Sequence, residues 1–266
     1  MARATTLGRR LVLPRPNPDA TRSLVCLSYC GGGTAPFRAW AGVLPADVEL
    51  AIVCYPGRES RYGEPFCRDW SALAEDTMAA LALLGPRPYA LFGHSMGSVL
   101  AFDVTAALEQ RGGHAPAALV VSGGDAPSRY AAQRAKPPTA ADSDERLVAW
   151  LRDTGQVDAE VLGDADLRSI AVDLLRADLV AAETYRYTPG VTVAAPVHLL
   201  YGADEDEPAA DVTARWRLLA RGEFQADVLA GGHFYTPAVW ATLPQLMSVS
   251  STVSSTVPWA VPPAAR

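Results

Sequence analysis

The stretch LFGHSMGSVLAF, residues 91–102, contains the pattern Gly-x-Ser-x-Gly between two apolar runs. The run YALF before it is typical of a buried strand, and the run after it is typical of a helix. A strand that turns directly into a helix crowds its own backbone, and Gly93 and Gly97, two residues to either side of Ser95, relieve that crowding. The pattern predicts a nucleophile elbow that holds the Ser95 hydroxyl above the strand end. The alternative is a glycine-rich turn in which Ser95 only caps the helix.

Strand-like and helix-like segments alternate along most of the chain. Short apolar runs rich in β-branched residues suit parallel strands that are covered on both faces. They occur at residues 23–29, 48–55, 89–93, 118–123, 196–202 and 225–231. Helical periodicity appears over 70–85 and 96–113. The alternation predicts an α/β protein with a doubly wound, mostly parallel sheet.

The alternation stops between residues 126 and 195, where no strand is predicted. Two amphipathic helices are predicted there instead, over 143–153 and 164–185. We expect this insertion to form a helical lid over the carboxyl edge of the sheet, although an ordinary helical layer fits the same pattern. The expected organisation is one domain over residues 1–246, followed by a flexible Ser/Thr/Pro-rich tail over 247–266.

Length and charge narrow the class of protein. The chain has 266 residues, 49% of them hydrophobic, which suits one sizeable globular α/β domain. Its net charge of −6 argues against bulk attraction to nucleic acid or to an anionic membrane. There is no apolar run near the ~20 residues of a membrane span, and no secretory leader is recognisable. We therefore expect a cytoplasmic protein, and a monomer.

A serine hydroxyl needs an adjacent base to act as a nucleophile. The chain has four histidines. His233 lies in LAGGHFYTP, just after the last predicted strand, and so at the edge of the sheet where Ser95 is expected. By contrast, His94 is expected to pack within the elbow, His114 to be solvated in a polar turn, and His198 to lie in the core. His233 is therefore the predicted general base.

The acid that orients His233 should follow the strand at 196–202, because this architecture orders its triad Ser, acid, His. The sequence there is GADEDEPAAD, and its first three acidic residues are all within reach. The usual spacing of three residues after the strand-ending glycine falls on Glu205. A longer turn selects Asp206, and a shorter one Asp204. Our prediction is Asp206, with Asp204 as the second choice.

Two backbone N–H groups are candidates for an oxyanion hole. Met96 begins the helix after Ser95, so its N–H faces the reacting centre. The second donor should come from the loop after the first main strand, SYCGGGTAPFRAW, whose glycines let the backbone approach a ligand closely. We assign it to the N–H of Cys30. No neighbouring residue suggests that the Cys30 thiol itself is activated.

Five segments in order resemble the type II thioesterases, the discrete editing hydrolases of polyketide and nonribosomal peptide pathways. They are LVLPRPNPDATRSLVCLSYCGGGTAPFRAW, YPGRESRYGEP, FGHSMGSVLAFDVTAAL, LLRADLVAAETYRYTP and GGHFY. The family commonly has Phe-Pro-Tyr-Ala before the glycines, where this chain has Leu27, Ser28, Tyr29 and Cys30. The resemblance implies an α/β-hydrolase fold and hydrolysis of acyl thioesters through an acyl-serine, with no metal or other cofactor.

The resemblance also implies a partner, because these enzymes act on the phosphopantetheine arm of acyl or peptidyl carrier proteins. Arg58 and Arg61 follow the second main strand and could meet acidic groups of a carrier, or form structural ion pairs. Two other functions fit the same residues. One is a serine esterase for small oxygen esters, and the other is a non-catalytic carrier-binding module on the same fold.

Overall fold

The computed structural model describes residues 6–133 and 138–249. Their strands, in chain order, are β1 (Thr6–Leu7), β2 (Leu11–Val12), β3 (Arg22–Leu27), β4 (Val48–Val53), β5 (Tyr89–His94), β6 (Ala118–Ser122), β7 (Val197–Gly202) and β8 (Phe224–Leu229). The α-helices are α1 (Trp70–Leu81), α2 (Met96–Gln110), α3 (Pro127–Gln133), α4 (Asp144–Asp153), α5 (Ala159–Gly163), α6 (Ala165–Glu183), α7 (Ala209–Arg217) and α8 (Pro237–Val249). Three 3₁₀ helices complete the set: η1 (Ala35–Gly42), η2 (Glu59–Arg61) and η3 (Ala82–Leu84).

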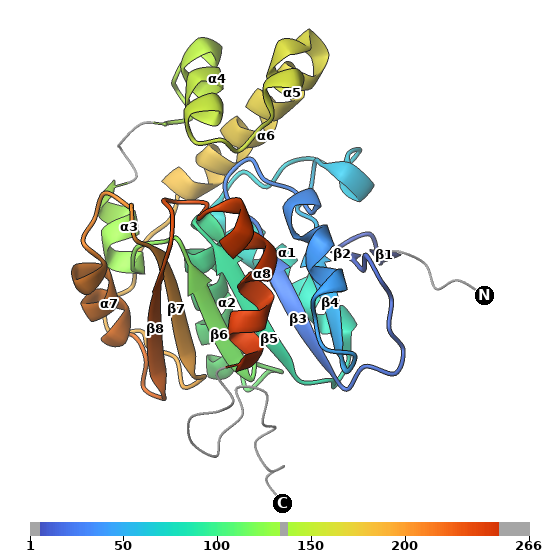
Figure 1. Cartoon of the computed structure of the whole chain (residues 1–266), viewed down its shortest axis with the longest axis vertical. Helices are drawn as coiled ribbons and strands as arrows, with labels where there is room; N and C mark the ends of the chain where they lie inside the picture. Colours follow the sequence, from blue (N-terminus) through green and yellow to red (C-terminus); the bar gives the residue numbers. More distant parts are fainter. Residues whose placement is uncertain (1–5, 134–137, 250–266) are drawn as a thin grey trace, which may run out of the picture.

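The strands form one sheet in the order β1-β2-β4-β3-β5-β6-β7-β8 (Figure 1). The six strands from β4 to β8 in this order pair in parallel, and only the short β1 and β2 are antiparallel. The predicted doubly wound, mostly parallel sheet is therefore confirmed. The carboxyl ends of the parallel strands meet at one edge, where the loops that carry Ser95 and His233 also lie.

Alternate side chains of the strands enter two separate hydrophobic cores. On β3, Val25 and Leu27 face the core that α1 and α2 cover, whereas Leu24 and Cys26 face the core beneath η1 and α8. The first core also includes Trp216 of α7. Burial on both faces explains why the strands read as continuous apolar runs.

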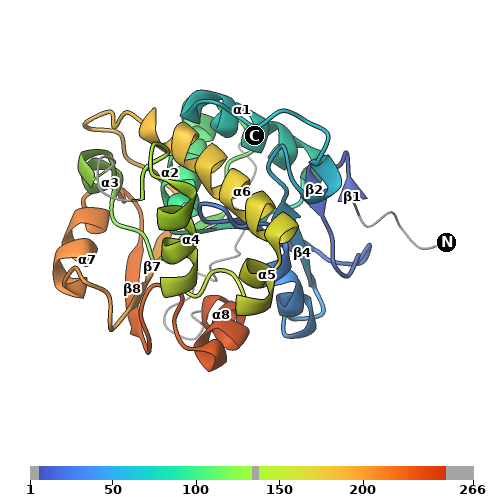
Figure 2. The ribbon, with the colours of Figure 1, turned by 90° about the horizontal axis from the view of Figure 1, so that it is seen from above.

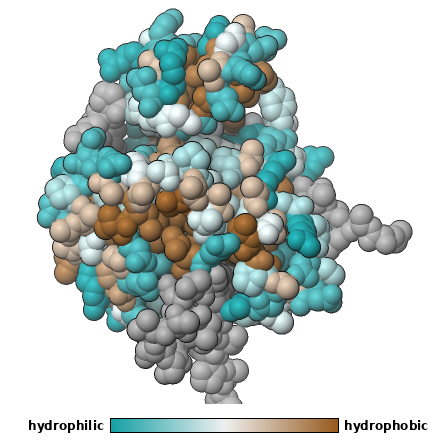
Figure 3. Space-filling view, in the orientation of Figure 1, coloured by the Kyte–Doolittle hydropathy of each residue, from teal (hydrophilic) through white to brown (hydrophobic). Residues whose placement is uncertain are grey.

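The lid helices α4, α5 and α6 stand beyond the edge of the sheet and pack on one another (Figure 1). Viewed from above, α6 runs across the sheet (Figure 2). Their own core contains Leu147, Leu151, Leu162 and Leu175. Figure 3 shows apolar side chains between α4 and α5, with polar residues on the outside. The inserted segment between β6 and β7 is thus a helical lid, as predicted.

Capping residues fix where the lid helices begin. The Ser143 side chain accepts the N–H of Arg146 at the start of α4, and the Asp164 side chain accepts the N–H groups of Asp166 and Leu167 at the start of α6. At the end of the chain, α8 runs to Val249, three residues into the predicted tail. Residues 250–266 lie outside the described part of the chain.

Candidate functional site

Ser95 lies between β5 and α2 with φ of 55° and ψ of −120°, a backbone conformation that residues other than glycine rarely adopt. Hydrogen bonds hold this strained residue on both sides. Its N–H donates to the Ser122 carbonyl at 2.8 Å, and its own carbonyl accepts the Ser98 hydroxyl at 2.6 Å. The Ser95 side chain is therefore presented at the strand end by its backbone.

Gly93 and Gly97 are required by contacts with neighbouring backbone. A Cβ atom on Gly93 would lie 1.9 Å from the Gly97 carbonyl oxygen. A Cβ atom on Gly97 would lie 2.6 Å from the carbonyl oxygen of Leu27 and 2.7 Å from that of Ser28. The loop after β3 consequently lies directly against the start of α2, next to Ser95.

The structure brings His233 to Ser95 from the loop after β8. Nε2 of His233 lies 2.9 Å from Oγ of Ser95. The loop folds tightly, because Tyr235 donates its N–H to the Gly232 carbonyl and Gly231 adopts a φ of 104°. The Tyr235 hydroxyl then donates to the Leu200 carbonyl on β7 at 2.9 Å. These bonds fix the position from which His233 reaches the serine.

The carboxylate that meets His233 is Glu205, and not the Asp206 or Asp204 that we favoured from the sequence. Oε1 of Glu205 lies 3.1 Å from Nδ1 of His233. An N–H on Nδ1 that donates to this carboxylate leaves Nε2 as the acceptor for the Ser95 hydroxyl. The three groups thus lie in the arrangement of a catalytic triad, with glutamate in the acid position.

The reason for the difference lies in the turn after β7. The pairing of β7 with β8 continues past the strand end, because Ala203 donates its N–H to Leu229 and Asp204 donates its N–H to Gly231. Ala203 and Asp204 form a turn, in which the Glu205 N–H donates to the Gly202 carbonyl at 3.5 Å, and this turn places the Glu205 side chain against His233. Asp204 and Asp206 on either side of it are exposed.

His94 lies behind His233 and takes part in a buried hydrogen-bond chain. Nδ1 of His94 lies 3.0 Å from the Ser122 hydroxyl, which lies 2.7 Å from the Tyr235 hydroxyl. Because Tyr235 gives its proton to a carbonyl, Ser122 donates to Tyr235 and accepts the Nδ1–H of His94. Burial and the nearby His233 hold the pKa of His94 well below its usual range. His94 is therefore a neutral packing residue, as predicted, and sequence reasoning missed Ser122 and Tyr235.

The two remaining histidines lie elsewhere. His114 is exposed, as predicted. His198 on β7 faces Asp227 on the neighbouring β8, with its Nε2 2.7 Å from Oδ2 of Asp227. This pair stands at the edge of the sheet, so the prediction of a core position for His198 is only partly right.

The candidate oxyanion donors, Met96 and Cys30, lie side by side. Sγ of Cys30 is 3.3 Å from Sδ of Met96. Met96 is the first residue of α2, so its N–H has no acceptor within the helix. Within the described residues, the Cys30 N–H likewise has no hydrogen-bond acceptor. Burial and the negative charge of Asp178 raise the pKa of the Cys30 thiol, which keeps the thiol protonated.

Arg58 and Arg61 are both buried in ion pairs. Arg58 is 3% exposed and pairs with Asp178 of the lid helix α6. Arg61 is 2% exposed and pairs with Asp76 of α1. A buried guanidinium cannot reach the surface of a partner, so the structural alternative is correct for both arginines.

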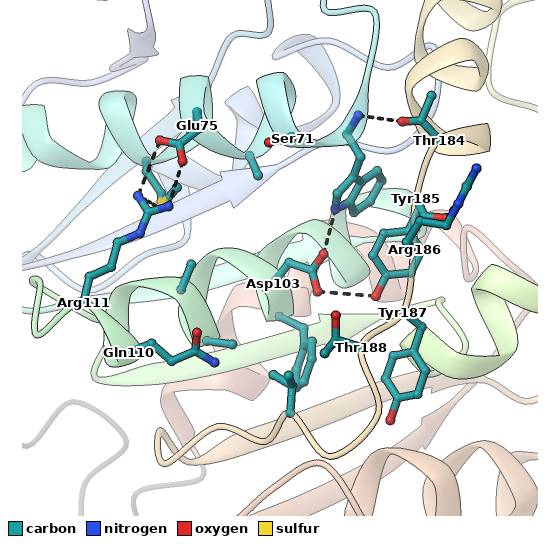
Figure 4. A pocket seen from close by; sticks show the side chains of 17 residues that line it. Ser71, Glu75, Asp103, Gln110, Arg111, Thr184, Tyr185, Arg186, Tyr187 and Thr188 are labelled. Carbon is teal, nitrogen blue, oxygen red and sulfur yellow. Dashed lines mark hydrogen bonds and ion pairs between the residues drawn. The ribbon is translucent and has the colours of Figure 1, made fainter.

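A cavity of about 420 Å³ lies away from these groups, between α1, α2 and the segment after the lid (Figure 4). Asp103 of α2 accepts the indole N–H of Trp70 at 2.7 Å and the hydroxyl of Tyr185 at 3.4 Å. The backbone N–H of Trp70 donates to the Thr184 hydroxyl at 2.8 Å. These bonds fasten the C-terminal end of the lid to α1 and α2. Burial raises the pKa of Asp103 to about 6.

Comparison with known proteins places this geometry in context. Residues 22–249 match the family model of the thioesterase domain. Thioesterase PikA5 of Streptomyces venezuelae is 35% identical over 231 residues, which cover 85% of this chain and 79% of the relative. AMB antimetabolite synthetase AmbE of Pseudomonas aeruginosa is 36% identical over 231 residues, but they cover only 11% of that long protein and 86% of this chain. The solved structure of the type II thioesterase BorB from the borrelidin biosynthetic cluster is 35% identical, with a TM-score of 0.77 over 89% of this chain and 97% of that one.

Proposed function

The chain belongs to the thioesterase domain family, and we propose that it is a discrete type II thioesterase that hydrolyses acyl thioesters carried by acyl or peptidyl carrier proteins. The observation that carries this proposal is the hydrogen-bonded series Ser95–His233–Glu205 at the carboxyl edge of the sheet. Support for the substrate class comes from PikA5 and BorB, which are named as thioesterases, BorB as a type II enzyme of a biosynthetic cluster.

The proposed reaction has two stages. His233 takes the proton of Ser95 as the hydroxyl attacks the thioester carbonyl, and the N–H groups of Met96 and Cys30 stabilise the oxyanion. The pantetheine thiolate leaves with the proton that His233 returns, and the acyl group remains on Ser95. His233 then activates a water molecule, which releases the carboxylic acid and restores the serine. Glu205 stabilises the imidazolium at both stages, and no group from outside the chain is needed besides water.

We propose that the pantetheine arm enters between the lid and the sheet. A cavity of about 300 Å³ lies there, lined among others by Tyr29, Gly32, Ile170 and Leu174. Its walls come from the glycine loop and from α6, the elements that flank the candidate oxyanion hole. Within the described ranges no helix combines the length and apolar character needed to cross a membrane.

The test compares acyl-loaded carrier protein with an oxygen ester of the same acyl group. We expect a higher kcat/KM on the carrier thioester, and loss of several orders of magnitude in Ser95→Ala and His233→Ala with little change in thermal stability. A clear preference for the oxygen ester would instead assign the site to a small-molecule esterase. Near-normal rates in either variant would contradict the assignment of both residues.

A further inference from the structure

The lid helix contributes a buried carboxylate to the loop of the candidate oxyanion hole. Asp178 of α6 is 5% exposed, and its Oδ2 accepts the N–H of Gly31 at 2.8 Å. The same carboxylate accepts hydrogen bonds from both terminal nitrogens of Arg58, at 2.6 and 2.9 Å. Arg58 in turn donates to the Gly32 carbonyl at 2.6 Å. One ion pair therefore holds two consecutive residues of the glycine loop.

These contacts determine the shape of a tight turn. The Gly32 N–H donates to the Tyr29 carbonyl at 3.0 Å, so residues 29–32 form a β-turn with Cys30 and Gly31 at its centre. Gly31 has a φ of 75°, the positive value that a type II turn requires at its third residue. In that turn the central peptide carries the N–H of Gly31, the group that Asp178 accepts. The carboxylate thus stabilises this orientation of the central peptide against the flipped one.

This β-turn also sets the direction of the Cys30 N–H. That N–H belongs to the planar peptide that also contains the Tyr29 carbonyl, and the two groups point in opposite directions across it. Since the Gly32 N–H holds the Tyr29 carbonyl, the Cys30 N–H is aimed the other way. The Tyr55 hydroxyl donates to the carbonyl of Ser28, the residue just before the turn, at 3.1 Å.

Close packing brings the lid to the same turn. A Cβ atom on Gly31 would lie 3.2 Å from the Cα atom of Leu175, one turn before Asp178 on α6. Leu175 itself is fully buried. The glycine turn is therefore enclosed by α6 above it, by Arg58 at its side and by the start of α2 below it.

From these contacts we infer that Asp178 and Arg58 are positioning residues, which aim the Cys30 N–H at the oxyanion only while the lid helix α6 is seated on the glycine loop. The inference rests on the proposed function, since it assigns a role within the same site. Both act through the backbone of residues 29–32. Arg58 also lines the cavity proposed for the pantetheine arm, whereas Asp178 is not among its lining residues. Lid seating and oxyanion stabilisation are thereby coupled: a lid displaced from this position leaves the turn without its anchor.

The variant Asp178→Asn tests this coupling, because an amide of the same shape loses the charge that pairs with Arg58. We expect kcat to fall by roughly 10²-fold, within the range found when one oxyanion donor is lost, while KM changes by less than about threefold. The matched control is Asp76→Asn. It breaks the other buried arginine pair, with Arg61, which does not contact the glycine loop. We expect the control to lose stability but to keep its kcat.

A second readout separates positioning from general damage. An acyl trifluoromethyl ketone forms a tetrahedral oxyanion adduct with the nucleophilic serine, whereas an unreactive thioether analogue of the substrate measures ground-state binding. We expect Asp178→Asn to weaken binding of the ketone by about the same factor as it lowers kcat/KM, and to leave binding of the thioether unchanged. A purely structural role for Asp178 would weaken both ligands together, and that result would overturn the inference.

Arg58 supplies an independent variant in case Asp178→Asn does not fold. A lysine in place of Arg58 keeps the charge but cannot donate to Asp178 and Gly32 in the same fork, so we expect an intermediate loss of kcat. We also expect Arg58→Gln and Asp178→Asn to be strongly non-additive in the double variant, because both act through one turn. Additive effects would contradict the shared route.

Rates are measured on a p-nitrophenyl ester as well as on the carrier thioester. The two substrates distinguish a failure of the proposed thioesterase function from a failure of the positioning inference. If the wild-type chain hydrolyses the ester but not the thioester, the proposed substrate is wrong and the positioning test still stands. If both substrates react and Asp178→Asn keeps its wild-type kcat, only the positioning inference is wrong. Unreactive Ser95 in the folded wild-type chain would overturn both.

Discussion

Replacing Glu205 by glutamine probes the site where structure and sequence disagree most. Glutamine keeps the size of the side chain and can still accept the Nδ1–H of His233, but it removes the negative charge. The imidazolium that forms as Ser95 attacks then has no opposing charge beside it. We expect Glu205→Gln to lower kcat strongly and to leave substrate binding almost unchanged.

The separation of the two side chains sets the size of the effect. At the 3.1 Å between Oε1 of Glu205 and Nδ1 of His233, two unit charges interact by about 5 kcal/mol at an effective dielectric constant of ~20. The Glu205 and His233 side chains are 14% and 31% exposed, so solvent screening lowers that figure. An interaction of about 3 to 5 kcal/mol corresponds to a loss of roughly 10²- to 10⁴-fold in kcat.

The assay is steady-state hydrolysis of an acyl-loaded carrier protein, with Asp204→Asn and Asp206→Asn as matched controls. Both controls remove one negative charge from the same loop, and neither side chain is the one that meets His233. We expect each control to stay within about threefold of the wild-type kcat, as is usual for exposed charges. The assignment is refuted if Asp204→Asn or Asp206→Asn is the variant that loses activity and Glu205→Gln is not.

Three further outcomes follow from other parts of the structure. We expect Gly93→Ala to lower the free energy of unfolding by at least about 3 kcal/mol in urea titrations, because its Cβ would overlap backbone that cannot move aside; a wild-type midpoint would show that the elbow can relax. Cys30→Ala should keep kcat within about threefold, since the role proposed for Cys30 lies in its backbone N–H, whereas a large loss would implicate the thiol. Burial raises the pKa of Asp103 to about 6, so the folded state holds this proton more tightly than the unfolded chain, and the free energy of unfolding falls as pH rises from about 4 to 6. Asp103→Asn should remove about 1 kcal/mol of that decrease between pH 5 and pH 6, and equal pH dependence in both proteins would contradict the assignment.

The strands β3 to β7 were predictable because they are buried on both faces and therefore read as apolar runs, whereas the edge strand β8 is only partly buried. The predicted strand at 48–55, for example, contains β4 at Val48–Val53. By contrast, β1 and β2 have two residues each, which is too few for any periodicity to show. Helix α8 contains Pro244, a residue that normally argues against a helix interior.

The nucleophile and the base were predictable for a different reason. The elbow at Ser95 needs glycines at fixed offsets because of backbone contacts, and His233 follows the last strand of the sheet. The structure brings these two side chains together as the sequence predicted. Their catalytic roles are the proposal made above.

The acid could not be chosen from the sequence, because three adjacent carboxylates follow β7 and one residue of turn length decides between them. The hydrogen bonds that the N–H groups of Ala203 and Asp204 donate to the carbonyls of Leu229 and Gly231 set that length. The pairing of Arg58 with Asp178 joins residues 120 positions apart, so no local pattern could reveal it. The usual three-residue spacing after Gly202 was the signal that pointed to Glu205.

The most direct test of the central claim is to find where the acyl group resides during turnover. The chain is mixed with acyl-loaded carrier protein, quenched in acid within one turnover, and analysed by intact mass followed by peptide mapping. The account predicts one added acyl mass, located on Ser95 and absent from Ser95→Ala. Release of the acid by a folded Ser95→Ala chain at the wild-type rate, or an adduct located on Cys30, would contradict it.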